Sequence, residues 1–168
     1  MVTDVATKRA VVERIRAVPD PEIPVLSIDD LGIVRGLVVD EAQRRVHVTI
    51  TPTYSGCPAM KSIEQGIQHA ARQAGYTAEV ETRLTPAWTT DWMSESGKLA
   101  LERFGIAPPS TTSSPSGPVA VSLGRRVVTC PVCGSSDTEE LSHFGATACK
   151  ALRRCRSCRE PFEEFKSL

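Results

Sequence analysis

Apolar residues alternate with polar ones in the first half of the chain and then change to a helical spacing. Val46, Val48 and Ile50 are separated by single polar residues, as in a strand with one buried face. Over Pro58–Gly75 the apolar positions recur every three or four residues, and the closing glycine stands where a helix C-terminal cap belongs. These positions are Met60, Ile63, Ile67, Ala71 and Ala74. The sequence therefore predicts a strand followed directly by a helix.

The same patterns predict further elements around this pair. Helices are expected over Asp4–Val18 and from Asp91 or Trp92 to Phe104, and strands over Ile33–Val39 and Thr77–Leu84. The order α-β-β-α-β predicts an α+β fold, in which a small open sheet carries its helices on one face. The third strand should lie parallel to a strand of the hairpin and be joined to it by a right-handed crossover.

Connecting segments are predicted to shape the ends of this sheet. Pro19–Pro24 contains three prolines in six residues, which stop the first helix and keep the backbone extended. Ser27–Gly32 has the polar start and the glycine end of a short capped turn. Trp88 and Trp92 can line a site for a partner, but large aromatic side chains here more often close the open end of a sheet.

A single cysteine, Cys57, stands at the junction of strand and helix, in the segment Thr51–Pro58. Pro58 suits the first helical position, because its missing N–H would have no partner there, and Cys57 is then the expected N-cap. Free backbone N–H groups and the positive end of the helix dipole favour a thiolate, which attacks electrophiles or binds soft metals. The alternative interpretation is a small buried residue that fills a turn after Gly56.

Two cysteine pairs organise the C-terminal part of the chain. Residues from 125 onward include few large apolar side chains, and a module of this size rarely folds without a crosslink such as a disulfide or a structural metal ion. Cys130 and Cys133, like Cys155 and Cys158, leave a gap of two residues, so that two pairs can complete a tetrahedral Zn²⁺ site. Zinc contributes on the order of 10–16 kcal/mol in small zinc modules. A redox function is the weaker alternative, because thioredoxin-type motifs occur singly on a strand–helix scaffold.

The last segment also contains a sixth cysteine and a run of basic residues. Cys149 is either a buried thiol on a ribbon strand or a partner of Cys57 at a transient metal site. The basic run is either a solvated hairpin face or a surface that docks an acidic partner or phosphates. Its members are Lys150, Arg153, Arg154, Arg156 and Arg159. Because no aromatic residues are interleaved for base stacking, nucleic acid is not the favoured partner.

Composition and charge narrow the function classes. The 168 residues allow one domain and a small appendage, and 40% apolar with 24% charged residues is typical of a soluble globular protein. Because 20 basic residues balance 20 acidic ones, no global field favours nucleic acid or a membrane. No apolar run approaches the ~20 residues of a bilayer span, and charges interrupt the start where a signal peptide would be apolar. The six cysteines are thus expected in the reducing cytoplasm, where they more often hold metal than form disulfides.

One segment separates the two parts of the chain. Pro108–Pro118 contains only proline, serine, threonine and glycine, and so cannot bury a core. We therefore expect a first domain over residues 1–106, a linker over residues 107–124 and a zinc ribbon over residues 125–168.

Several motifs resemble known families. This sequence resembles the domain shared by bacterial SufT and the eukaryotic cytosolic iron–sulfur targeting proteins. The stretches that carry this first resemblance are Asp20–Pro24, Leu31–Val34 and Thr51–Pro58. Nearly the whole chain outside the linker resembles the PaaD family, which is encoded with the multicomponent phenylacetyl-CoA epoxidase of aerobic phenylacetate catabolism. The stretches that carry this second resemblance are Trp88–Trp92, Gly105–Pro109 and Phe144–Lys150.

The resemblance implies a non-enzymatic accessory protein that assembles or delivers a metal centre to that epoxidase. The recipient would be the iron–sulfur cluster of its reductase or the di-iron site of its oxygenase. Cys57 would contact iron or a cluster transiently, alone or with Cys149. The residues that match the motif and would shape its loops are Asp20, Glu22, Gly56 and Pro58. Because a cluster takes about four ligands, a bridged homodimer, a second thiol or ligands of the recipient would be required.

Two other function classes stay open. The chain could be a thiol-dependent or structural subunit of the oxygenase complex itself. A nucleophilic Cys57 would then need a base, for which His47 and His69 are the nearest candidates in the sequence. The chain could also be a nucleic-acid-binding zinc ribbon, whose affinity would fall steeply with added salt.

Overall fold

The computed structural model describes residues 2–109 and 127–167, with side chains from residue 8 onward. The chain forms two compact units, Met1–Gly97 and Lys98–Leu168, each with a sheet of its own. Of the expected linker over residues 107–124, only residues 107–109 lie within the described ranges.

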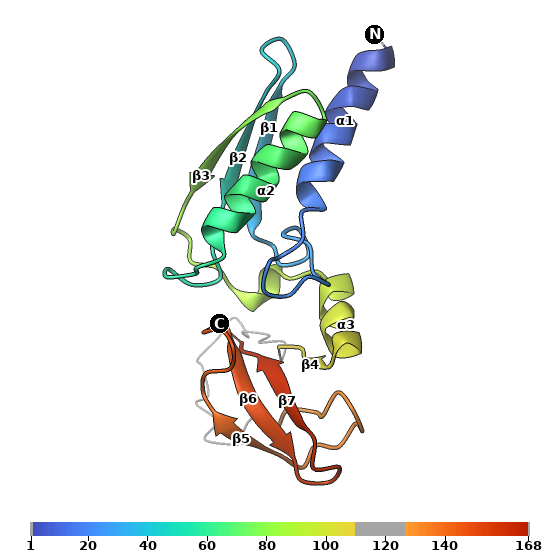
Figure 1. Cartoon of the computed structure of the whole chain (residues 1–168), viewed down its shortest axis with the longest axis vertical. Coiled ribbons are helices and arrows are strands. Elements are labelled where there is room, and N and C mark those ends of the chain that lie inside the picture. Colours follow the sequence, from blue (N-terminus) through green and yellow to red (C-terminus); the bar gives the residue numbers. More distant parts are fainter. Residues whose placement is uncertain (1, 110–126, 168) are drawn as a thin grey trace, which may run out of the picture. The chain divides into compact units, whose positions relative to one another are not determined.

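The first unit contains a three-stranded sheet and two long helices. Its elements are α1 (Val2–Arg16), β1 (Val34–Asp40), β2 (Arg45–Ile50), α2 (Met60–Gln73), β3 (Thr77–Thr82) and the 3₁₀ turn η1 (Thr90–Trp92). In the strand order β1-β2-β3, β1 pairs antiparallel with β2, and β3 pairs parallel with β2. The predicted α+β fold, with its parallel third strand after a helix, is confirmed (Figure 1).

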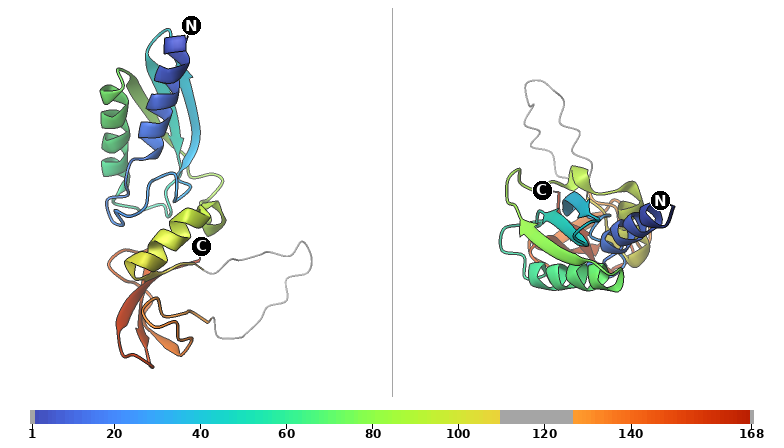
Figure 2. Two further views of the ribbon diagram at one scale, coloured as in Figure 1. Left: turned by 90° about the vertical axis from the view of Figure 1, so that its right-hand side faces the viewer. Right: turned by 90° about the horizontal axis from the view of Figure 1, so that it is seen from above.

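The core of this unit lies between the sheet and its helices. Both α1 and α2 cover the same face of the sheet (Figures 1 and 2). Val46, Val48 and Ile50 of β2 point into the core and are at most 1% exposed, and Ile63 and Ile67 of α2 are as deeply buried. The alternation along β2 therefore separates a covered face from an open one, as its pattern predicts.

Two predicted helix starts are wrong. Helix α2 begins at Met60 instead of Pro58, and α3 (Glu95–Phe104) begins three or four residues later than expected. A 3₁₀ turn occupies residues 90–92, and Ser94 then caps α3 by accepting a hydrogen bond from the N–H of Gly97 at 2.9 Å. A capping side chain therefore sets the start of α3. No side chain caps α2, whose N-cap is Ala59.

The second unit is built around a four-stranded sheet, in the order β4-β7-β6-β5. Its strands are β4 (Ile106–Ala107), β5 (Thr138–Ser142), β6 (Lys150–Cys155) and β7 (Pro161–Phe165). Strand β4 precedes the proline-rich segment in the sequence, yet it pairs in parallel with β7. The sheet of the ribbon therefore includes residues from before that segment.

Candidate metal centre and the Cys57 loop

Two turns with the same backbone hydrogen bonds present the clustered cysteines. We call them the first knuckle, Cys130–Ser135, and the second knuckle, Cys155–Glu160. In each, the carbonyl of the first cysteine accepts from the N–H four residues later, at 2.9 and 3.0 Å. The N–H of that cysteine donates to the carbonyl five residues later, again at 2.9 and 3.0 Å. The fifth residue has a left-handed backbone in both, with φ of 74° at Gly134 and 70° at Arg159.

The two knuckles bring four sulfur atoms together. The Sγ atoms of Cys130, Cys133, Cys155 and Cys158 all lie within 4.8 Å of one another. Sγ of Cys130 is 3.8 Å from Sγ of Cys158, and Sγ of Cys133 is 3.6 Å from Sγ of Cys155. A tetrahedral ion with metal–sulfur bonds of ~2.3 Å would separate its ligands by about 3.8 Å. The four cysteines therefore form a metal-binding site.

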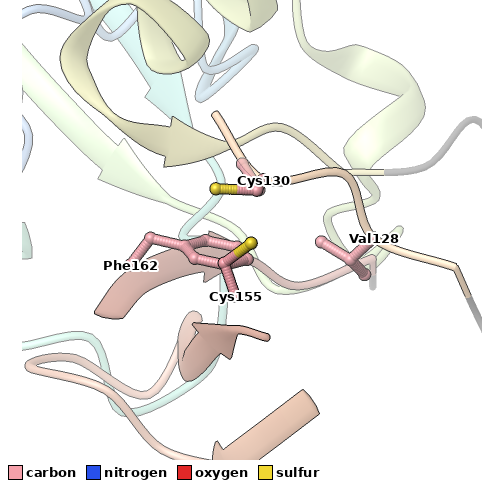
Figure 3. Close-up of a cluster of buried hydrophobic side chains, with 5 residues drawn as sticks. Val128, Cys130, Cys155 and Phe162 are labelled. Atoms are coloured by element: carbon pink, nitrogen blue, oxygen red, sulfur yellow. The ribbon is translucent and has the colours of Figure 1, made fainter. Parts of the chain in front are cut away.

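Apolar packing supports this site from one side. Cys130 and Cys155 are at most 1% exposed and belong to a cluster with Ala107, Val128 and Phe162. Figure 3 shows four of these side chains gathered together. Because Ala107 lies on β4, the segment before the proline-rich stretch helps to cover the metal ligands, a contribution that the local spacing of the cysteines does not reveal.

Backbone donors prepare one sulfur to bind a metal ion. The N–H of Cys158 lies 3.5 Å from Sγ of Cys155 and contributes most to lowering the pKa of that thiol. Burial acts to raise the pKa, but the N–H of Ser157 and the neighbouring sulfurs also lower it, and the result is about 6. The N–H of Glu160 acts to lower the pKa of Cys158, but burial and the neighbouring sulfurs raise it to about 12. The lowered pKa of Cys155 favours its thiolate, whereas the raised pKa of Cys158 keeps that thiol protonated until a metal ion displaces the proton.

Cys149 lies outside this cluster, in the turn before β6. It is buried, its Sγ lies 3.0 Å from the hydroxyl of Thr147, and its carbonyl accepts from the N–H of Lys166 at 2.9 Å. The structure agrees with the interpretation of a buried thiol in the ribbon.

Much of the basic run is engaged in ion pairs within the ribbon. Arg153 lies 2.9 Å from Glu164, and both side chains are at most 9% exposed. Lys150 lies 2.6 Å from Glu163, and Glu139 pairs with both Arg154 and Arg156. These pairs neutralise much of the run, which disfavours phosphate binding at this surface.

Cys57 lies in the loop between β2 and α2, residues 51–59, which we call the Cys57 loop. Its predicted position as the helix N-cap is wrong, because the N-cap is Ala59, which makes no side-chain cap hydrogen bond. The N–H of Cys57 donates to the carbonyl of Tyr54 at 3.2 Å, and its carbonyl accepts from the N–H of Met60 at 3.4 Å. Pro58 suits this separate turn as well as a helix start, since its fixed φ and its missing N–H are tolerated in both. The thiol of Cys57 is half-buried and forms no disulfide.

Strand register places three connecting segments at one end of the sheet. Val34 at the start of β1 and Thr82 at the end of β3 are both partners of Ile50 at the end of β2. Three connecting segments therefore meet the sheet at the same end (Figure 1). They are the segment before β1, the Cys57 loop and the segment after β3. In open α/β sheets, loops beyond the carboxyl ends of strands commonly bind ligands.

The motif residues in these segments differ in their structural roles. The carboxylate of Asp20 is 7% exposed and accepts from the N–H groups of Glu22 and Ile23, at 2.9 and 2.8 Å. Asp20 therefore shapes its loop, whereas the side chain of Glu22 is exposed. At Gly56 an added Cβ would make only ordinary contact with the ring of Tyr54, at 3.8 Å. The turn itself does not require a glycine there.

The tryptophan segment packs on the loop before β1. The indole N–H of Trp88 donates to the carbonyl of Leu31 at 2.8 Å, and the guanidinium of Arg35 lies 3.5 Å from the ring centroid of Trp92. Gly32 has φ of 66°, and a Cβ there would lie 2.3 Å from the carbonyl oxygen of Trp92. These contacts favour the interpretation that both tryptophans close the end of the sheet.

Hydrogen bonds to the carboxylate of Asp30, which the sequence analysis did not predict, hold the end of the tryptophan segment. The carboxylate of Asp30 accepts from the hydroxyls of Ser27 and Ser94, both at 2.6 Å, and from that of Ser96 at 3.1 Å. Burial acts to raise the pKa of Asp30, but these hydrogen bonds together hold it below its ordinary value. The turn from Ser27 to Asp30 can be read from the sequence, whereas the contact with Ser94 spans 64 residues.

Comparison with known proteins identifies both units. Residues 8–82 match the family described as iron–sulfur cluster assembly protein, and residues 114–166 match the PaaD zinc beta ribbon domain. The chain is 45% identical over 152 residues to a putative 1,2-phenylacetyl-CoA epoxidase subunit of Escherichia coli (strain K12). That match covers 90% of this chain and 87% of the relative. The chain belongs to the PaaD family.

Shorter relatives are similar to part of this PaaD chain. The Fe-S protein maturation auxiliary factor of Porphyromonas gingivalis is 36% identical over 97 residues, which cover 56% of this chain and 90% of the relative. The crystal structure of a domain of unknown function, DUF59, from Bacillus anthracis matches with a TM-score of 0.52 and 27% identity. It covers 60% of this chain and 95% of that one. Each of these two relatives is therefore matched over most of its own length by little more than half of this chain.

The described helices of this PaaD protein are short. The longest, α1, has 15 residues, and within the described ranges no helix qualifies as a membrane span.

Proposed function

We propose that this PaaD protein is a non-enzymatic accessory factor that helps to assemble or deliver a metal centre in a multicomponent phenylacetyl-CoA epoxidase. The observation that carries the proposal is the similarity to an epoxidase subunit over 90% of the chain. The match of residues 8–82 to iron–sulfur cluster assembly proteins supports the assembly role.

The second unit would hold Zn²⁺ as a structural ion. Four cysteine sulfurs at tetrahedral spacing and the match to a zinc ribbon support this assignment. Four protein ligands close the coordination shell of zinc and leave no position for water or substrate. When bound, the ion supplies folding free energy to the ribbon and takes no part in a reaction.

Cys57 is the proposed contact for the transferred metal. With four cysteines assigned to the metal cluster, Cys57 and Cys149 are the thiols that remain. Cys57 is half-buried in a loop at the carboxyl end of β2, whereas Cys149 is buried. In the proposed step the Cys57 thiolate is one ligand of iron or a cluster. A ligand of the recipient then forms its own bond to the metal, the bond to Cys57 breaks, and the thiolate is released. The other ligands would come from the recipient, from Cys149 or from Cys57 of a second copy.

The geometry does not favour Cys57 as the nucleophile of an enzyme. His69 lies nine residues into α2 from Met60, which is about 14 Å along a helix axis. Its ring nitrogen lies 2.8 Å from the side-chain nitrogen of Gln73. His47 lies three residues before the end of β2, about 10 Å along a strand, and pairs with Glu79 at 3.1 Å. Both side chains are engaged with other groups.

Anaerobic co-purification with the cognate reductase and oxygenase components tests the proposal. Zinc and iron would be counted per chain for the wild type, Cys57→Ala and the matched control Cys149→Ala. We expect Cys57→Ala to keep about one zinc ion, because the ribbon is untouched, and to leave the epoxidase short of iron. Full iron loading of the epoxidase with Cys57→Ala would refute the transfer role.

The same preparations test the alternatives. Loss of turnover by a fully metal-loaded oxygenase with Cys57→Ser would instead indicate a thiol-dependent subunit. The mass of the complex reports whether the expected homodimer forms. A DNA or RNA shift at low salt would indicate a nucleic-acid-binding ribbon.

A further inference from the structure

The loop between β5 and β6, residues 143–149, presents an exposed aromatic side chain on a rigid support. Phe144 is 63% exposed. The N–H of Gly145 donates to the carbonyl of Lys150 at 2.7 Å, and the N–H of Ala146 donates to the carboxylate of Glu163 at 3.0 Å. Because the backbone beside Phe144 is already held, little entropy remains to be lost when a partner binds.

The ammonium group of a nearly buried lysine lies beside this ring. Nζ of Lys166 is 4.6 Å from the centroid of Phe144 and donates to the carbonyl of His143 at 3.2 Å. Lys166 is only 8% exposed, and no carboxylate within residues 127–167 pairs with it. A carboxylate brought by another protein would complete this ion pair in a partly desolvated place.

An irregularity in β5 exposes a second apolar side chain nearby in the sequence. The pairing of β5 with β6 shifts between Glu140 and Ser142, so that Leu141 is the extra residue of a bulge. Leu141 is 49% exposed. Strand β5 is also an edge of the four-stranded sheet. Bulged edges resist pairing with other strands, so the surface offers side chains more than backbone groups.

This surface lies at the opposite end of β6 from the metal centre. Lys150, at the start of β6, pairs with Phe165 beside Lys166, whereas Cys155 ends the strand and begins the second knuckle. Five residue steps along a strand span about 17 Å. Changes at Phe144 can therefore be tested without disturbing the metal ligands.

We propose that Phe144, Leu141 and the ammonium of Lys166 form the surface through which this protein docks on the protein that receives the metal. The matching site on that protein would be an apolar pocket bordered by a carboxylate. This inference rests on the proposed function, because the partner is the recipient.

Dissociation constants with the purified reductase and oxygenase components test the inference. We expect Phe144→Ala to weaken binding to one component about thirtyfold, the loss typical of an aromatic hot spot. Lys166→Met, which keeps the packing and removes the charge, should weaken it about tenfold at low salt. Phe104→Ala, at the end of α3, is the matched control, because Phe104 is another exposed phenylalanine (54%), and it should change binding less than about threefold. Zinc content should stay the same in all three variants.

A Cys57→Ala arm separates this inference from the proposed function. It should bind like the wild type and fail to load iron. If it fails to load iron while Phe144→Ala binds both components normally, the docking inference alone is wrong. If Cys57→Ala loads iron fully, the proposed function is wrong whatever Phe144 does. A dimer that Phe144→Ala splits, with unchanged binding to both components, would mean that the surface joins two copies and would overturn the docking inference.

Discussion

Substitutions at equivalent positions of the two knuckles are expected to change the stability of the second unit in opposite directions. Both turns need a left-handed backbone at the fifth residue, which is glycine in the first knuckle and Arg159 in the second. The left-handed conformation costs a residue with a side chain roughly 1–2 kcal/mol, because its Cβ crowds the backbone. Glycine avoids this cost but loses about 0.5–1 kcal/mol more conformational entropy on folding. Arg159→Gly should therefore stabilise the zinc-loaded second unit by about 0.5–1 kcal/mol, and Gly134→Ala should destabilise it by a similar amount.

At Gly134 and Arg159 we expect the change in stability to come from the backbone conformation and not from side-chain packing. Apart from its own chain neighbours, no heavy atom lies within 4 Å of a Cβ built at Gly134, so an alanine there meets strain in the backbone alone. The side chain of Arg159 is exposed. Arg159→Ala is the control, because it removes the guanidinium and keeps the Cβ that causes the strain.

Thermal unfolding with excess zinc is the assay. A change of this size shifts the midpoint of a unit of about 70 residues by about 2–8 °C. We expect the midpoint to rise for Arg159→Gly, to fall for Gly134→Ala and to stay nearly constant for Arg159→Ala. If Arg159→Ala raised the midpoint as much as Arg159→Gly, the effect would belong to the side chain and the reasoning from φ would be refuted.

Two more predictions concern the separate units. Removal of metal with a chelator should expose the backbone amides of β6 and β7 to hydrogen exchange while β1, β2 and β3 stay protected, because only the second unit contains the four-cysteine site. Equal protection before and after chelation would contradict a structural metal. Because the folded-state pKa of Asp30 lies below its ordinary value of 3.8, its carboxylate should stabilise the first unit above that pH and lose this effect as pH falls through the lowered pKa. Urea unfolding between about pH 2 and 6 should show a steeper acid loss for the wild type than for Asp30→Asn, and identical pH profiles would exclude this role.

Local patterns in the amino-acid sequence determined much of this protein. The alternation of Val46, Val48 and Ile50 assigned the covered face of β2, because side chains of a strand alternate between two faces. The spacing of each cysteine pair indicated a metal site because a knuckle is also a local structure, a turn of six residues with internal hydrogen bonds. The family resemblance also came from short motifs, and the comparisons confirm it.

Contacts between distant residues were decided only by the tertiary structure. The expected helix cap at Cys57 was wrong because a separate turn, closed by Tyr54, precedes α2. The pairing of β4 with β7, the buried pair of Arg153 with Glu164 and the bond from Ser94 to Asp30 join segments that no local period connects. Sequence spacing reports interactions within a turn, a strand or a helix, whereas these contacts exist only once the sheets have formed. For the second unit, the sequence therefore indicated the metal ligands, whereas only the tertiary structure showed the core that supports them.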